Sequence, residues 1–225
     1  DSSEVVVDQA LQFIHNRTDK NRPFLAVIWY GTPHSPFNAN DEDTAPFAQL
    51  NINKKHQYGE IVALDRSIGT LRNGLRELGV AENTILWFCS DNGGLKAMGP
   101  ETVKGLRGFK GDLYEGGIRV PAIIEWPAVI KKATITNTPA VTMDIYPTIA
   151  AIAGVNEDDI LQPCDGVNLS SLIKGKAFQR KKAIPFRHTG RGALVDQNYK
   201  LISLNSEKKQ YELYDLENDP AETDN

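Results

Sequence analysis

Cysteine is scarce in this sequence, and long apolar runs and a surplus of basic residues are absent. Only two cysteines, Cys89 and Cys164, occur in 225 residues. Their spacing fits neither a disulfide framework nor a zinc site, so we expect two free thiols. No apolar run approaches the length that crosses a bilayer, and a net charge of −4 provides no basic surface for nucleic acid. We therefore expect no membrane span and no nucleic-acid partner.

The composition that remains is that of an ordinary globular protein, with 40% hydrophobic and 24% charged residues. The length allows one large domain with a small appendage. Because the first residue is not methionine, we expect that a preceding segment has been removed.

Hydrophobic periodicity predicts alternating helices and strands in the first part of the chain. Residues 5–17 and 55–78 have helical spacing, the second with an apolar face that includes Ile61 and Val62. Residues 24–30 and 84–89 are short apolar runs typical of buried strands. Strand, long helix and strand form a βαβ unit, whose strands should be parallel.

The connection that leads into the long helix spans residues 31–54, and an irregular connection of this length is usually functional or mobile. A further strand is expected at 120–126. A helix should then begin with Thr142 as its N-cap and end at Gly154.

Short alternating segments follow after residue 160, at 192–196, 199–204 and 210–216, with Gln197-Asn198 as a hairpin turn. The expected fold is therefore α/β, a mostly parallel sheet flanked by helices, with a small antiparallel sheet at the carboxyl end. The expected domains are residues 1–160 and 161–225.

The residues that carry chemistry follow the predicted strands. Asp91 and Asn92 come directly after one strand, and His34 follows the other. Parallel strands place their carboxyl ends at one edge of a sheet, so these side chains should converge there. Lys110 contributes a positive charge on a loop that is flanked by glycines. Two hard oxygen ligands beside a positive charge suit a metal ion that holds a tetrahedral oxyanion, such as a sulfate or phosphate ester.

Each of these residues also has a purely structural explanation. Asp-Asn-Gly is a common turn sequence, and His34 between two prolines can be an ordinary loop histidine. Arg107 and Lys110 are most simply solvated loop charges. The main role expected of Glu115-Gly116-Gly117 is a tight turn that lets the next strand begin.

The same residues lie in blocks that resemble successive blocks of the sulfatase family, in the family's order. These blocks are Thr32–Pro36, Phe88–Gly94, Leu106–Pro121, Met143–Gly154 and the closing block Tyr211–Glu222. The resemblance covers nearly the whole chain, and the block from Lys110 to Pro121 is the most specific part of it.

The resemblance implies an alkaline-phosphatase-like α/β fold and hydrolysis of sulfate esters. Asp91 and Asn92 match positions that bind a divalent cation, usually Ca²⁺. His34 and Lys110 match residues that contact the substrate sulfate and would serve catalysis. It also implies a sulfate ester as substrate and a periplasmic or secreted location.

The sequence departs from the family pattern in its amino-terminal elements. It contains no Cys/Ser-x-Pro-x-Arg element, whose first residue becomes the formylglycine nucleophile in the family. The family's paired aspartates and its Gly-Lys-Trp-His element are also missing. The chain thus resembles the carboxyl-terminal portion of a sulfatase. We expect an incomplete Ca²⁺ ligand set and no activity from this portion alone.

Two alternatives stay open. One is a phosphate or phosphonate ester hydrolase of the same superfamily, which would use two transition metals with additional His and Asp ligands. The other is a non-catalytic homologue that binds sulfated glycans. Because the chain resembles only a portion of the family's fold, the missing strands should leave an exposed apolar edge on this chain alone, which favours self-association.

Overall fold

The computed structural model describes residues 2–17, 22–205 and 207–225. The chain divides into two compact units, Asp1–Ile85 and Leu86–Asn225. The domain boundary predicted near residue 160 stays a prediction.

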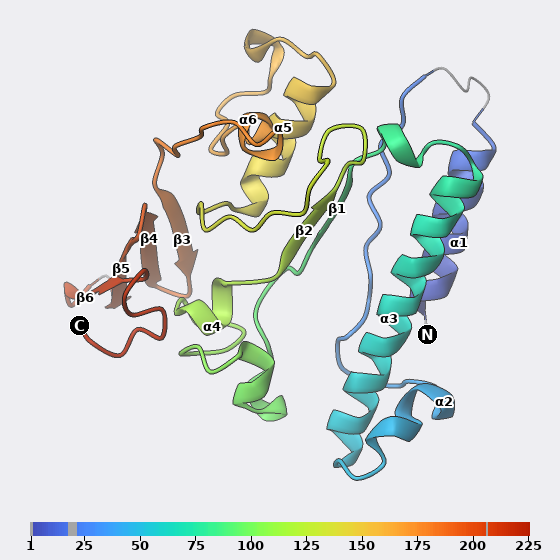
Figure 1. Ribbon diagram of the computed structural model, residues 1–225. Coiled ribbons are helices and arrows are strands. Elements are labelled where there is room, and N and C mark those ends of the chain that lie inside the picture. Colours follow the sequence, from blue (N-terminus) through green and yellow to red (C-terminus); the bar gives the residue numbers. More distant parts are fainter. Residues whose placement is uncertain (1, 18–21, 206) are drawn as a thin grey trace. The chain divides into compact units, whose positions relative to one another are not determined.

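The first unit is built on two long helices that pack against each other, α1 (Ser2–His15) and α3 (Ile52–Glu77) (Figure 1). The Asn51 side chain caps α3 by accepting a hydrogen bond from the Lys54 amide at 3.1 Å. Gly79, at φ +69°, follows the end of the helix.

The buried face of α3 matches the predicted apolar face only in part, since Leu71 and Leu75 of that face are buried. Ala63 and Ser67 are fully buried, whereas Ile61 and Val62 are 45% and 36% exposed. Small residues let α1 approach closely, and the Leu11 side chain lies where a Cβ on Gly74 would be. Close helix packing on small side chains therefore overrides the apolar pattern here.

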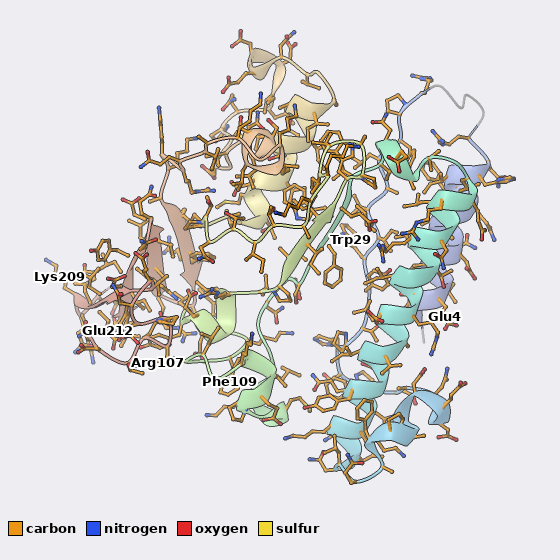
Figure 2. All side chains as sticks on the ribbon, in the orientation of Figure 1. Glu4, Trp29, Arg107, Phe109, Lys209 and Glu212 are labelled. Carbon is orange, nitrogen blue, oxygen red and sulfur yellow. The ribbon has the colours of Figure 1, made fainter. Side chains whose placement is uncertain are left out.

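The strand predicted at residues 24–30 is not formed, since these residues have no assigned element in the structure. Their exposure alternates as in a strand, and Leu25, Val27 and Trp29 are 64%, 67% and 85% exposed. Figure 2 labels Trp29 on this extended segment. An extended segment becomes a strand only when its backbone pairs with another. Within the described part of the first unit there is no strand to pair with it, so the expected βαβ unit is not seen.

The connection over residues 31–54 is partly helical rather than irregular. It contains α2 (Asp41–Thr44) and the 3₁₀ turn η1 (Ala45–Phe47), and a second 3₁₀ turn, η2 (Ala81–Asn83), follows α3. Asp43 is buried and accepts two hydrogen bonds from Arg66, at 2.6 and 2.9 Å. These bonds from Arg66 lower the pKa of Asp43 and fasten the connection to α3.

The second unit begins with a two-stranded sheet of β1 (Leu86–Cys89) and β2 (Ala122–Glu125). The pair is antiparallel, with Leu86 opposite Glu125 and Cys89 opposite Ala122. Both strands were predicted. Between them lie η3 (Lys96–Met98), η4 (Pro100–Val103) and the single-turn helix α4 (Glu115–Ile118).

The helix predicted from Thr142 begins as the 3₁₀ turn η5 (Thr142–Asp144) and continues as α5 (Ile145–Ile152). Thr142 is not the N-cap; it lies inside η5. The fully buried Asp144 carboxylate instead accepts from the Val141 amide at 2.9 Å and pairs with Arg180 at 2.6 Å. Gly154, at φ +79°, ends the helix as predicted. Two short helices follow, η6 (Glu157–Asp159) and α6 (Ser170–Ile173).

The carboxyl-terminal sheet is antiparallel, as predicted. Its four strands pair in chain order: β3 (Ile184–His188), β4 (Arg191–Asp196), β5 (Tyr199–Asn205) and β6 (Gln210–Asp215). Gln197-Asn198 forms the predicted hairpin turn, since Asp196 pairs with Tyr199. No strand was predicted at β3.

The core of this sheet includes a residue from the segment before α4. Leu113 is buried in one cluster with Ala193, Ile202 and Tyr214, and Tyr114 and Ile118 pack against that cluster. The sheet is therefore packed on the same segment that follows Lys110.

Three loop segments of the second unit meet backbone to backbone at glycines. A Cβ on Gly93 would lie 1.9 Å from the Gly116 carbonyl oxygen, and one on Gly116 would lie 2.1 Å from the Gly108 carbonyl oxygen. A Cβ on Gly117 would lie 2.2 Å from the Asp112 carbonyl oxygen. Only glycine allows this approach.

This packing yields a prediction for two glycine-to-alanine variants. Gly93→Ala must displace backbone, so we expect it to lower the free energy of unfolding by about 1–3 kcal/mol or more. The matched control is Gly69→Ala on α3, where an added Cβ meets no atom within 4 Å. Its helix propensity should raise stability by up to about 1 kcal/mol. Urea unfolding followed by circular dichroism measures both, and equal midpoints would contradict the packing argument.

Candidate functional site

The Asp-Asn-Gly loop begins where β1 ends and is held by backbone contacts. The Ser90 hydroxyl donates to the Asn92 carbonyl at 3.0 Å, and the Gly93 amide donates to the Gly117 carbonyl at 2.9 Å. Asp91 is exposed and Asn92 is half-buried. The loop thus presents one carboxylate and one amide side chain on a fixed backbone.

Lys110 lies on a tight turn beside that loop. Its amide donates to the Gly94 carbonyl at 2.9 Å, and the turn closes through a bond from the Asp112 amide to the Phe109 carbonyl at 2.8 Å. The Asp112 side chain accepts from the Phe109 amide at 3.1 Å. The structure therefore brings the backbone of Lys110 next to the loop of Asp91 and Asn92, and the predicted convergence of their side chains stays a prediction.

Arg107 is not the solvated loop charge that its sequence position suggests. Its guanidinium lies over the Tyr114 ring, 3.9 Å from the centroid, and donates to the Tyr214 hydroxyl at 2.8 Å. It also donates to the carbonyl of Glu222 at 2.9 Å and lies 3.8 Å from Glu212.

Both tyrosine hydroxyls of this cluster donate to Glu212 Oε2 at 2.7 Å. Burial raises the pKa of Tyr114, and the bond to the Glu212 carboxylate raises it further. Burial opposes ionisation of Glu212, but the two hydroxyls and Arg107 together lower its pKa. The cluster therefore ties the loop of Arg107 to β6. Spacing alone gives no signal for it, because its members come from two segments that are far apart in the sequence.

Glu115 was expected only in a tight turn, yet it is 6% exposed and begins α4. Its carboxylate accepts a hydrogen bond from Lys200 on β5 at 3.0 Å. This buried ion pair across the unit was not predicted.

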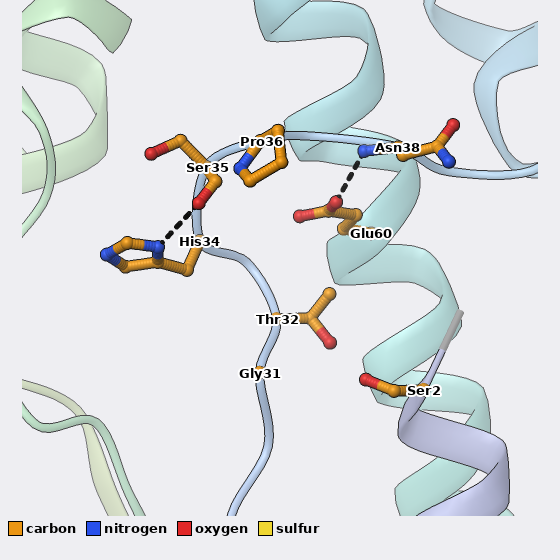
Figure 3. A pocket seen from close by; sticks show the side chains of 8 residues that line it. All are labelled: Ser2, Gly31, Thr32, His34, Ser35, Pro36, Asn38 and Glu60. Carbon is orange, nitrogen blue, oxygen red and sulfur yellow. Dashed lines mark hydrogen bonds between the residues drawn. The ribbon is translucent and has the colours of Figure 1, made fainter.

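His34 lies in the first unit, on the connection between the extended segment and α2. Its Nδ1 is 2.8 Å from the Ser35 carbonyl oxygen, and because a carbonyl only accepts, Nδ1 is the donor. Figure 3 shows the ring directed away from the helix that carries Glu60.

A pocket of about 280 Å³ borders His34 and is lined also by Thr32, Ser35, Asn38 and Glu60 (Figure 3). Glu60 is 4% exposed, and its Oε1 accepts from the Asn38 amide at 2.7 Å. Burial raises the pKa of this carboxyl, which the Asn38 amide partly offsets. Glu60 was not predicted as a site residue, and it holds the backbone that follows His34.

The fit of a metal ion depends on the donors that the chain offers. Carboxylate and amide oxygens such as those of Asp91 and Asn92 are the ligands that Ca²⁺ prefers, but Ca²⁺ takes six to eight of them. Among the described residues no group of three or more His, Cys, Asp or Glu side chains is placed to hold a metal. The oxygen donors of Asp91 and Asn92 are of the type that fits Ca²⁺, but two residues provide fewer ligands than the ion takes.

The sequence prediction thus separates into two parts. Asp91, Asn92 and Lys110 lie on neighbouring loops of one unit. His34 belongs to the other unit, and its convergence with them stays a prediction. Among the helices of the described residues, none is long and apolar enough to cross a membrane.

Two family models match the chain. The one described as "Sulfatase" matches residues 1–155, and the one described as "N-sulphoglucosamine sulphohydrolase, C-terminal" matches residues 109–225.

Two curated proteins show the same relationship. A sulfatase of Formosa agariphila is 31% identical over 99% of this chain and 45% of its own length. Human steryl-sulfatase is 35% identical over 75% of this chain and 29% of its own length. The chain therefore spans about half the length of the first of these relatives, and less of the second.

Among solved structures, that of Ps i-CgsB in complex with k-i-k-neocarrahexaose superposes with a TM-score of 0.87 at 31% identity. The match covers 98% of this chain and 49% of that one. The predicted fold class is thereby confirmed. The chain has an alkaline-phosphatase-like α/β fold, and the sulfatase family model matches its residues 1–155. The chain therefore belongs to the sulfatase family.

Proposed function

We propose that this chain forms the carboxyl-terminal part of an enzyme that hydrolyses sulfate esters. The observation that supports the proposal is the backbone bond from Lys110 to Gly94, which brings the backbone of Lys110 beside the Asp91–Asn92 loop in a member of the sulfatase family. A sulfate ester develops negative charge on its sulfuryl oxygens and leaving group during hydrolysis. An ammonium group fixed next to oxygen ligands is suited to stabilise that charge.

Each residue has one role in this proposal. Lys110 and His34 contact the sulfate: the ammonium group neutralises charge, and the imidazole donates a hydrogen bond or a proton to the leaving oxygen. Asp91 and Asn92 contribute to a Ca²⁺ site completed by residues outside this sequence. When bound, the cation supplies further positive charge to the sulfate oxygens.

The nucleophile is proposed to lie outside this sequence, as a formylglycine in a Cys/Ser-x-Pro-x-Arg element. Covalent hydrolysis needs a nucleophile, so the 225-residue chain alone is proposed to be inactive. A sulfated glycan is the favoured substrate class, supported by the complex of Ps i-CgsB with k-i-k-neocarrahexaose. A periplasmic or secreted location goes with such a substrate.

The alternatives from the sequence receive less support. A two-metal phosphate or phosphonate hydrolase would use additional His and Asp ligands, and the sequence around Asp91 has no neighbouring histidine. A non-catalytic glycan-binding homologue would need the same residues for binding, so only turnover separates it from an enzyme. Self-association stays a prediction, and Ile123, 65% exposed on β2, is an apolar side chain available for it.

We expect Lys110→Ala in the full-length protein to lower kcat/KM for an aryl sulfate about 10²–10³-fold, since it removes one charge from the transition state. His34→Ala should cost about 10²–10⁴-fold. Lys132→Ala and His188→Ala are the matched controls, exposed residues outside the proposed site that should turn over at wild-type rates. Steady-state kinetics measures all four, and control-like rates for Lys110→Ala would refute its role.

Calcium dependence tests the cation site. A chelator should abolish turnover by the full-length protein, and added Ca²⁺ should restore it. Asp91→Asn removes a ligand charge and should raise the Ca²⁺ concentration for half-maximal activity by about tenfold or more. Metal analysis of the full-length protein can contradict this proposal, since two equivalents of zinc or manganese would favour the phosphate ester hydrolase instead.

The missing nucleophile yields a direct comparison. The isolated 225-residue chain should show no aryl sulfate turnover above a metal-free buffer blank, whereas the full-length protein should be active. Turnover by the isolated chain would refute the proposed location of the nucleophile.

A further inference from the structure

The closing block of the sequence, Tyr211–Glu222, has no role in the proposed chemistry, yet its last residue is fully buried. Glu222 lies beyond β6 with φ +57°, a conformation that few residues adopt. The turn that bears it is held by the Asp219 carboxylate, which accepts from the amides of Thr223 at 2.7 Å and Asp224 at 2.9 Å.

The Glu222 carboxylate contacts two groups of the same unit. Its Oε2 accepts a hydrogen bond from the Glu115 amide at 2.6 Å. Its Oε1 forms an ion pair with the Lys200 ammonium at 2.8 Å. Lys200 is also fully buried and donates to Glu115 Oε1 at 3.0 Å. The three side chains form one buried charge cluster.

Charge balance explains why the cluster tolerates burial. Two carboxylates surround one ammonium group, and Arg119 lies 3.7 Å from Glu115 Oε2 at its exposed side. Burial raises the pKa of Glu222, and the bonds to Lys200 and the Glu115 amide oppose that rise. Removal of a single buried partner would leave uncompensated charge, which is strongly unfavourable.

From Glu115 the backbone leads directly to both site loops. The next residue, Gly116, donates to the Arg107 carbonyl at 2.7 Å, three residues before Lys110. Gly117 accepts from the Gly93 amide at 2.9 Å, two residues after Asp91. Because these glycine backbones touch without intervening side chains, a shift of Glu115 is transmitted to both loops.

We propose that Lys200 and Glu222 are positioning residues of the candidate site: they fix Glu115, and through Gly116 and Gly117 they set the placement of Lys110 and of the Asp91–Asn92 loop. The inference rests on the proposed function of that site. Neither residue touches substrate in this scheme, and their effect is carried by backbone contacts.

Hydrogen exchange measured by mass spectrometry tests the backbone part on this chain without any activity. In Lys200→Met, amides in residues 90–94 and 107–117 should exchange about tenfold faster or more. Glu222→Gln should have a smaller effect, because Lys200 keeps Glu115 as partner. The double variant Lys200→Met/Glu222→Gln should exchange more slowly than Lys200→Met alone. In Lys200→Met the buried Glu222 carboxylate has lost its ammonium partner, and Glu222→Gln removes that uncompensated charge.

The matched control is Arg180→Met, which breaks the other buried ion pair of this unit, Asp144–Arg180, at 2.6 Å. It should lower the thermal midpoint without faster exchange in residues 90–94 or 107–117. If Lys200→Met does not fold, the comparison of Glu222→Gln with Arg180→Met carries the test. Equal exchange in these residues for Glu222→Gln and wild type would overturn the inference.

Kinetics of the full-length protein tests the functional part. Glu222→Gln should lower kcat for an aryl sulfate, whereas Arg180→Met, although less stable, should retain wild-type kcat below its melting temperature. Faster exchange with unchanged kcat would overturn the positioning role. If the wild-type protein shows no sulfatase turnover, the proposed function fails, and the exchange result still decides whether the cluster holds the loops.

Discussion

Direct contact between glycine backbones is the constraint on which the candidate site depends. Where Gly93 meets Gly116, no side chain separates the two segments, so amide and carbonyl groups bond across the gap. The backbones of the Asp91–Asn92 loop and of the Lys110 turn are consequently joined by hydrogen bonds, directly and through Gly116 and Gly117. Their relative placement follows from main-chain geometry and needs no contact between their side chains.

The carboxyl-terminal sheet supports this junction from a distance in sequence. Tyr214 and Ile202 bury Leu113, and Lys200 reaches Glu115 on α4. The sequence pattern suggests that this sheet is a separate small unit. Its core and its buried charges nevertheless include residues of the segment that follows Lys110. Polar groups without water must find partners, and here those partners come from segments about a hundred residues apart in the sequence.

The first unit fixes its own site residue by a different device. The connection bearing His34 is held on α3 through Asn38, which donates to Glu60, and through the bidentate contact of Asp43 with Arg66. The extended segment before it exposes every second side chain, Trp29 included. In the described part of this unit, a buried carboxylate and an ion pair thus hold the connection that bears His34 on α3.

The sequence by itself determined the family, the two long helices, β1, β2 and most of the carboxyl-terminal sheet, because periodicity and turn residues are local signals. It also identified the neighbouring loops of Asp91 and Lys110. Only the tertiary structure decided the antiparallel pairing of β1 with β2, the unpaired state of residues 24–30 and the buried partners of Glu115. Those features depend on which distant segments come into contact, and the local pattern of residues along the chain does not predict such contacts.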